Sequence, residues 1–407
     1  MAISYVSGAS AASNTVAMPT HTTGDLIFCF AFRDGNVAAP TAPAGWTVLD
    51  SIIGGTSCSS TLGYKYAASG SETTGTWTNA SGVVVVVYRG CYYVGGSAVQ
   101  GYGVSSSITH PDTGVPYYNN TLWSVRFCGH RSATNLGTNA PSGYTARAGT
   151  ATECYAFDNS SFTAATGTQA QSVSASSGWN ADCLQLIDAS TVTTPVGNFY
   201  DDFNTGSTPD SSKWRAVNYT GGTVSLSSGQ LLASATSTAG SQGAIVSQSM
   251  YTFAGSSVSF KVNAVSLGTY ATAFGGFVAS RSSLGWVFLG TTAQPSWNFS
   301  DGAFIYPSTM GSALTHVSGY RYRIRESGGT TYWDYSTNNG LSWVNQFSEA
   351  TGATPRTSYP ELSAKHYEVV APIIGASSGI YLANAGTAYF DDLNPQVGGK
   401  GAFFTMF

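Results

Sequence analysis

The chain has 407 residues, a formal net charge of −4 and only 9% charged residues. Aromatic residues make up 13% of it and hydrophobic residues 42%, a composition that excludes a disordered chain and predicts packed cores. There is no run of Lys or Arg to neutralise successive phosphates, and no stretch of about 18 apolar residues, so neither nucleic acid nor a membrane is an expected partner.

Short apolar runs bounded by turn residues recur along the chain, while helical periodicity is never sustained. We expect strands over residues 26–32, 61–66, 83–88, 122–127, 184–187, 258–262, 286–289, 320–324 and 331–335. A chain of this length usually folds as more than one domain. The sequence therefore predicts an all-β protein with two β-sandwich or jelly-roll domains in tandem.

The first predicted domain, residues 1–190, carries an internal duplication. Residues 28–33 begin with Phe-Cys and end with Arg, as residues 127–131 do, and the Pro-x-Gly-aromatic turn at 43–46 recurs at 141–144. Because the two correspondences keep nearly the same separation, we expect a sandwich built from two similar halves whose aromatic residues interdigitate.

The six cysteines all precede residue 190, and none lies in a CxxC pair or a metal-binding cluster. They are Cys29, Cys58, Cys91, Cys128, Cys154 and Cys183. The main interpretation is six free, buried thiols, as expected for a protein assembled in a reducing compartment. Disulfide bonds are the alternative.

A Thr/Pro/Gly-bearing segment, residues 191–200, is the predicted linker, and residues 201–395 form the second predicted domain. This domain begins and ends with acidic-aromatic segments, which suggests that its first and last strands are neighbours. Such an arrangement would gather the carboxylates of Asp201, Asp202, Asp391 and Asp392. Four carboxylates suit a Ca²⁺ ion, and the alternative is strand-end side chains in water or bonded to turn amides.

The last segment, residues 396–407, is a glycine-rich tail that ends in an aromatic strip. The strip contains Phe403, Phe404, Met406 and Phe407. We expect it to be covered, either as a flap against its own domain or as a peptide docked in a neighbouring subunit.

The first 95 residues contain the segments GDLIFCFAFRDG, PAGWTVLD, YKYAASGSETTGTWTNAS and VVVVVYRG in order. In these segments the chain resembles a domain type of tailed-bacteriophage minor structural and tail-fibre proteins. The resemblance implies association with a virion and supplies no catalytic residues.

The second domain contains DDFNTGSTPDSSKW, GGTVSLSSGQLLASA, YRYRIRESGGTTYWDYSTNNGLSW and TAYFDDLN. In these segments it resembles concanavalin-A-like, laminin-G-type jelly rolls, a fold that hosts glycan binding, protein contacts and some glycosidases. Residues 336–343 also resemble the Asp-box hairpin, with Asn338 in place of the usual Asp. A tight turn with a structural role is expected there.

Glycan binding needs an exposed aromatic ring on which a sugar can stack, with short polar groups beside it. The candidates are Tyr117, Tyr118, Trp297 and Tyr306. Aromatic residues within strands are usually core residues, so the loop positions are the better ones.

The sequence contains no recognisable reaction centre. It lacks the E-x-D-x-E strand of concanavalin-A-like glycosidases, a G-x-S-x-G elbow and an HExxH motif. We therefore expect a protein that is not an enzyme. If it were a depolymerase of capsule or lipopolysaccharide, Glu326, Asp334, Glu361 and Glu368 would be the carboxylate candidates.

The N-terminus lacks the basic start and apolar stretch of a secretory signal, although the low charge suits a protein that faces the medium. Both features fit a virion component, made in the host cytoplasm and exposed on the particle. The main prediction is a virion structural protein of tail fibre, baseplate or head decoration that forms a homo-oligomer, assembles with other virion proteins and contacts glycans of the host surface. A receptor-binding adhesin whose lectin-like second domain grips host polysaccharide is the alternative.

Overall fold

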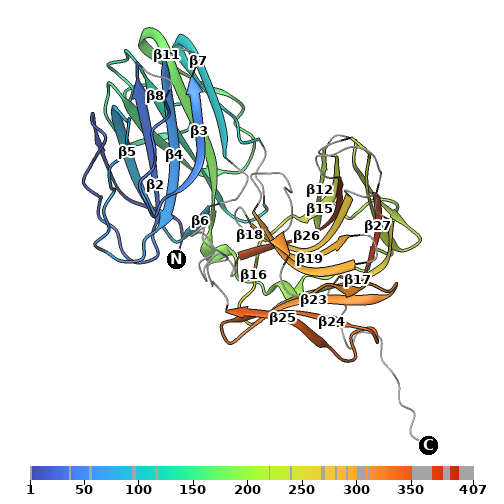
Figure 1. Ribbon diagram of the computed structural model, residues 1–407. Coiled ribbons are helices and arrows are strands. Elements are labelled where there is room, and N and C mark those ends of the chain that lie inside the picture. The colour runs from blue at the N-terminus through green and yellow to red at the C-terminus, as the bar shows by residue number, and fades with distance from the viewer. Residues whose placement is uncertain are drawn as a thin grey trace, which may run out of the picture. The chain divides into compact units, whose positions relative to one another are not determined.

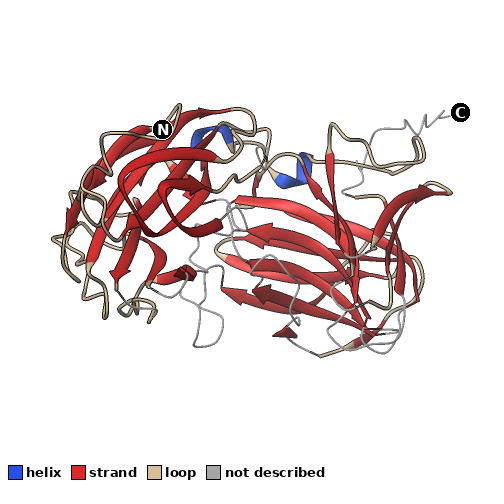
Figure 2. Ribbon diagram, turned by 90° about the horizontal axis from the view of Figure 1, so that it is seen from above, coloured by secondary structure: helices blue, strands red, loops and turns tan. Residues whose placement is uncertain are grey.

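The computed structural model describes residues 2–35, 38–54, 57–93, 98–114, 118–219, 221–238, 241–266, 271–279, 282–289, 292–299, 308–309, 312–350, 369–378 and 386–393. Over these ranges the regular structure is almost entirely strand, and the helical turns are the short 3-10 segments η1 (Ala189–Thr191) and η2 (Val196–Asn198) (Figure 2). The predicted all-β class is confirmed. Within the same ranges no helix has the length and apolarity needed to cross a membrane.

The chain divides into two compact units (Figure 1). The first contains Met1–Val192, and the second begins at Thr193. The predicted linker segment therefore contributes most of its residues to the start of the second unit, where η2 lies.

The first unit has two antiparallel sheets. One has the strand order β1-β5-β2-β4-β3, and the other has the order β6-β11-β8-β10-β9 with β7 paired to β11. The strands of the first sheet are β1 (Ser4–Ala11), β2 (Leu26–Asp34), β3 (Thr47–Gly54), β4 (Cys58–Tyr66) and β5 (Gly82–Arg89). Those of the second are β6 (Cys91–Tyr93), β7 (Val99–His110), β8 (Leu122–His130), β9 (Thr145–Gly149), β10 (Cys154–Phe162) and β11 (Gln169–Asp188).

The two sheets repeat the same order when β7 is set aside, with β6, β8, β9, β10 and β11 in the places of β1 to β5. The predicted duplication is therefore present in the topology. The pairing between strands has diverged, because Phe28 lies opposite Tyr64 whereas Phe127 lies opposite Ala156. The two halves share the order of their strands but not the pairing of residues between those strands.

The core between the sheets is aromatic, as the duplication predicted. The ring of Phe127 lies 6.1 Å from that of Phe28 and 5.9 Å from that of Phe30, measured between ring centroids. Phe32 lies against Gly129, where an added Cβ would overlap its ring. Glycine at this position lets the two sheets approach closely.

Strands β2 and β5 are buried on both faces along most of their length. On the side away from the second sheet, their alternate residues pack against Trp46 and Trp77, whose rings meet edge to face at 5.3 Å. Burial on both faces explains why β5 has an unbroken run of valines, since neither face needs polar side chains.

All six cysteines lie in the first unit as free, buried thiols. Burial raises the pKa of Cys58 to about 11 and the pKa of Cys29 well above its usual value. The interpretation as small apolar core residues is confirmed.

The second unit also has two antiparallel sheets. A nine-stranded sheet has the order β12-β15-β26-β18-β19-β20-β21, with β16 beside β26 and β22 beside β20. A seven-stranded sheet has the order β13-β14-β27-β17-β23-β24-β25. The bounds in the nine-stranded sheet are β12 (Trp214–Tyr219), β15 (Gln242–Ser247), β16 (Tyr251–Thr252), β18 (Ala271–Ala279), β19 (Ser282–Leu289), β20 (Thr292–Phe299), β21 (Ser308–Thr309), β22 (Leu314–Thr315) and β26 (Val369–Ser378). Those in the seven-stranded sheet are β13 (Thr223–Ser227), β14 (Gln230–Ala235), β17 (Ser257–Ser266), β23 (Tyr320–Ser327), β24 (Thr330–Ser336), β25 (Val344–Ala350) and β27 (Gly386–Asp391).

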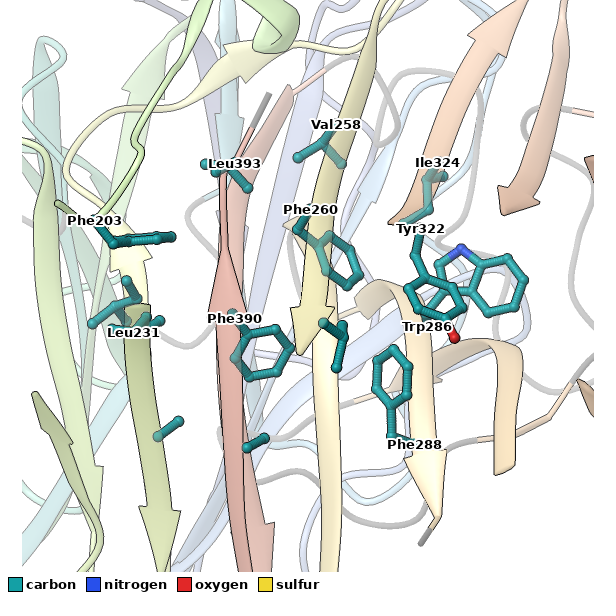
Figure 3. Close-up of a cluster of buried hydrophobic side chains, with 14 of the residues drawn as sticks. Phe203, Leu231, Val258, Phe260, Trp286, Phe288, Tyr322, Ile324, Phe390 and Leu393 are labelled. Atoms are coloured by element: carbon teal, nitrogen blue, oxygen red, sulfur yellow. The ribbon is translucent and has the colours of Figure 1, made fainter. Parts of the chain in front are cut away.

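Two tryptophans join the sheets of the second unit. Trp286 of β19 donates its Nε1 hydrogen bond to the carbonyl of Arg323 at 3.2 Å, and Trp333 of β24 donates to the carbonyl of Gly285 at 3.0 Å. Around Trp286 the rings of Phe288 and Tyr322 fill the core (Figure 3). Each buried indole N–H thus has a partner in the opposite sheet, which fixes the spacing of the two layers.

The Asp-box-like segment forms the predicted tight turn between β24 and β25. Asn338 Oδ1 accepts from the backbone N–H of Ser342 at 3.0 Å, and Ser336 Oγ accepts from that of Gly340 at 2.8 Å. Asn339 and Gly340 have φ angles of +59° and +89°. Asn338 thus performs the turn-closing role of the aspartate that it replaces.

Candidate functional site

The two ends of the second unit meet at one isolated bridge, but no three of the four predicted carboxylates, all within the described residues, form a metal-binding group. Asp201 and Leu393 form an antiparallel bridge whose backbone hydrogen bonds measure 3.3 and 2.8 Å. Asp201 Oδ2 accepts from Trp214 Nε1 at 2.7 Å, and its Oδ1 accepts from the backbone N–H of Phe203 at 2.8 Å. Asp202 Oδ1 accepts from a turn amide at 3.1 Å.

Cationic side chains hold the other two carboxylates. Lys261 Nζ lies 3.2 Å from Asp391 Oδ2, and Arg321 Nη2 lies 2.6 Å from Asp392 Oδ2. Burial raises the pKa of Asp392, and the neighbouring Asp391 carboxylate adds to this. Over the described ranges no group of three or more His, Cys, Asp or Glu side chains is arranged to hold a metal ion. The alternative interpretation, bonding to turn amides, fits Asp201 and Asp202, whose Oδ1 atoms accept from backbone N–H groups.

Of the four predicted glycan-binding aromatics, Tyr118 and Trp297 lie within the described residues. Tyr117 and Tyr306 lie outside the described residues, as do Phe403, Phe404, Met406 and Phe407 of the tail. Trp297 is in β20, opposite Leu284 and Ser308 in the register. Tyr118 lines a groove on the surface of the first unit.

The groove at Tyr118 is a half-open depression of about 620 Å³ on the first unit. Its lining consists of Tyr118, Asn119, Asn120, Thr121, Leu122, Ser160, Ser161, Phe162 and Thr163. All of these residues are uncharged. Tyr118 is 5% exposed and Phe162 is 3% exposed, whereas the hydroxyl-bearing residues of the lining are exposed. The groove therefore offers exposed amide and hydroxyl groups, and the ring of Tyr118 is not the exposed stacking surface that the sequence predicted.

Two strand ends build this groove. Leu122 opens β8 and lies opposite Phe162 at the end of β10, just after an irregularity in the pairing that follows Asn159. Asn159 Oδ1 accepts from the backbone N–H of Ser161 at 2.9 Å, and Asn120 Nδ2 donates to the carbonyl of Thr191 at 3.0 Å. These bonds hold both walls in place before any ligand arrives.

A second polar surface lies on the outer side of β23 and β24. We call it the arginine face and define it by Arg323, Arg325, Tyr332, Asp334 and Trp343. Asp334 is buried, and its Oδ2 accepts from Arg323 Nη2 at 2.7 Å and from Arg325 Nε at 2.8 Å. The guanidinium of Arg325 lies 3.7 Å from the ring centroid of Tyr332, and that of Arg323 lies 4.1 Å from Trp343.

Most residues of both surfaces were not predicted from the sequence. Tyr118 was a candidate, but its Asn, Ser and Thr neighbours were not, because short polar residues are common throughout this chain. Asp334 was a candidate for polysaccharide cleavage and not an expected partner of two arginines. The alternation of arginine at 321, 323 and 325 was a usable signal, since residues two apart in a strand share a face.

The carboxylates considered for polysaccharide cleavage are held by other groups or lie outside the described residues. Glu326 Oε1 accepts from the backbone N–H of Gly329 at 2.7 Å, and Asp334 is bonded to the two arginines. Glu361 and Glu368 lie outside the described ranges. The described strands of the nine-stranded sheet contain no Asp or Glu.

Comparison with known proteins gives structural likeness only. No protein-family model matches the chain, and no curated protein sequence matches it. Similar solved structures include an endo-acting O-glycanase of human gut bacteria, with TM-score 0.36 and 10% identity over 48% of this chain and 97% of that one. A non-specific endo-β-1,3(4)-glucanase from family GH16 has TM-score 0.36 and 10% identity over 48% and 89%. A transglycosylase in complex with NAG has TM-score 0.36 and 11% identity over 49% and 85%.

These matches overturn one prediction from the sequence. The matched proteins are glycanases and a transglycosylase, so the prediction that the chain is not an enzyme is withdrawn. At this level of identity the likeness concerns the jelly-roll fold, and no activity is transferred from it. The comparisons do not point to a bacteriophage protein.

Proposed function

We propose that the protein is a receptor-binding adhesin that contacts carbohydrate, and that the groove at Tyr118 is a binding site for neutral sugar units. The observation that carries this proposal is the lining of the groove, in which every described residue is uncharged and amide and hydroxyl side chains are exposed. Sugar rings present hydroxyl groups at their edges, which exposed amide and hydroxyl side chains can bind, whereas the buried rings of Tyr118 and Phe162 offer no face for stacking.

The volume of the groove sets the scale of the ligand. About 620 Å³ accommodates a short stretch of a polysaccharide chain and not a folded partner. A shallow, solvated site of this kind supports weak affinity per site, with dissociation constants of about 1 mM, or about −4 kcal/mol. Several copies on one assembly would raise the avidity, so the predicted homo-oligomer suits this function.

A groove-filling variant tests the proposal. The intact chain is applied to an array of neutral and acidic glycans, and retained glycans are then titrated by calorimetry. Thr163→Trp, at the exposed rim, is expected to abolish retention on neutral glycans because the indole occupies the groove. The matched control Thr152→Trp adds the same side chain at an exposed turn position outside the groove and is expected to bind normally.

Two results would contradict the proposal that the groove at Tyr118 binds neutral glycans. One is an unmodified chain that retains no neutral glycan at millimolar concentration, and the other is equal retention by Thr163→Trp and the unmodified chain. The same reactions are assayed for new reducing ends, because cleavage of a bound glycan would assign an enzymatic function in place of simple binding.

Placement on a bacteriophage particle remains a prediction that rests on the resemblance of the first 95 residues. The predicted contacts with other virion proteins and the docking of the tail at residues 396–407 depend on the same placement. Copurification with intact particles, and its loss on deletion of residues 398–407, is the outcome expected of a virion protein. A chain found only free in lysates would contradict it.

A further inference from the structure

We propose that the arginine face of the second unit is a separate subsite for the carboxylate groups of a uronate-bearing polysaccharide. It lies in a different unit from the groove at Tyr118, so loss of binding at one site can be measured separately from loss of binding at the other. The arginine face carries more positive than negative charge. Two guanidinium groups, those of Arg323 and Arg325, share one carboxylate, that of Asp334.

The bonds already formed leave a specific set of donors free. Arg323 points its Nε and Nη2 at Asp334 Oδ2, whereas Arg325 uses only its Nε. Among the residues that the structure describes, none accepts from the two Nη atoms of Arg325 or from Nη1 of Arg323. The paired Nη atoms of Arg325 form an end-on fork that matches the two oxygens of a carboxylate.

The two arginines are held in place and are also accessible to solvent. Their side chains are 22% and 29% exposed, whereas the side chain of Asp334 is 2% exposed. Tyr332 and Trp343 lie against the flat sides of the guanidinium groups, which restricts rotation and leaves the N–H edges open. Binding of a ligand therefore costs little side-chain conformational entropy, because the fold already holds these donors in place.

Polar side chains flank this fork on neighbouring strands. Ser257 of β17 lies opposite Arg325 in the register, and Ser348 of β25 lies opposite Tyr332, so both share the outer face. Ser348 is exposed and Ser257 is partly exposed. Hydroxyls beside a carboxylate receptor on a flat sheet suit the secondary hydroxyls of an acidic sugar, which favours a polysaccharide over a lone anion.

The test compares polymers that differ in one property. Binding of the full chain to polygalacturonate is measured by calorimetry beside dextran, which lacks charge, dextran sulfate, which lacks carboxylates, and polyglutamate, which lacks sugar. We expect polygalacturonate to bind at least about tenfold more tightly than each of the other three. Equal binding of dextran, dextran sulfate or polyglutamate would overturn the assignment.

Substitutions at Arg325 test the fork itself. Arg325→Gln should weaken polygalacturonate binding by about tenfold or more, and Arg325→Lys should lose most of the affinity although it keeps the charge. The fold should survive because Asp334 keeps its bonds to Arg323 and Asn345, which a thermal melt of each variant checks. Arg131→Gln, which removes the same charge from the first unit, is the matched control and should bind normally. Full affinity in either Arg325 variant would refute the proposal.

Discussion

Phe30 and Phe127 stack across the interface between the two sheets of the first unit, with ring centroids 5.9 Å apart and ring planes 15° from parallel. Both are fully buried, and they come from β2 and β8, the strands that correspond to each other in the two halves of the duplication. This contact joins the repeated halves at their centre.

Phe127→Ala is expected to destabilise the first unit by about 3–5 kcal/mol, because the cavity would remove ring contacts with both Phe28 and Phe30. Urea denaturation of the chain, followed by near-ultraviolet circular dichroism, measures the change. Tyr102→Ala, at a position 60% exposed in the same unit, is the control and should change stability by less than about 0.5 kcal/mol. A loss below about 1 kcal/mol in Phe127→Ala would mean that the halves are joined elsewhere.

Asp182→Asn should stabilise the first unit at neutral pH by about 1–3 kcal/mol. Asp182 is buried, its two carboxylate oxygens have no partner within the described ranges, and burial raises its pKa well above 3.8, with Asp50 adding to the shift. Since the raised pKa belongs to the folded state, folding is favoured most below pH 3.8, and this advantage is lost as pH rises through the folded pKa.

Thermal melts of the Asp182 variant between pH 4 and pH 8 test this expectation. The variant should be less sensitive to rising pH than the unmodified chain. Asp188→Asn is the contrasting control, because Asp188 accepts from the backbone N–H groups of Ile3 at 3.3 Å and Ser190 at 2.8 Å and should lose stability. Identical pH profiles for the Asp182 variant and the unmodified chain would contradict the raised pKa.

His110 should make the first unit less stable as pH falls. Burial lowers the pKa of His110 to about 3, although its hydrogen bond to Gln171 at 2.8 Å opposes this. The contribution of the neutral ring is complete above pH 6.5, the ordinary value, and is lost as pH falls towards the folded pKa. From pH 7 to pH 5 the expected loss is about 2 kcal/mol. His110→Leu should remove this part of the pH dependence in urea denaturation at the two pH values, and an unchanged slope would count against it.

Gly340→Ala tests the Asp-box-like turn. Its φ of +89° is unfavourable for any residue with a Cβ, so the variant should lose about 1–2 kcal/mol in the stability of the second unit. Thr337→Ala, exposed in the same turn, should stay within about 0.5 kcal/mol. Equal thermal melts for the two variants would show that the turn tolerates a different backbone conformation.

The sequence predicted the fold at the level of sheets and halves because alternating and doubly buried apolar runs carry that information locally. The Phe-Cys repeat at 28 and 127 therefore indicated the matching sheet order, while the shifted pairing of those phenylalanines depends on contacts between strands far apart in the chain. The site was less predictable for the same reason. Arg323 and Arg325 were not predicted as site residues, and their shared bond to Asp334 depends on the register of β23 with β24.

The six buried thiols of the first unit affect how the folded protein responds to the redox state of its surroundings. Burial keeps each sulfur protonated and away from oxidants and metal ions, and none is bonded to another. The folded unit therefore depends on no disulfide bond. Once folded, such a chain can move from one redox compartment to another without forming or breaking a disulfide bond.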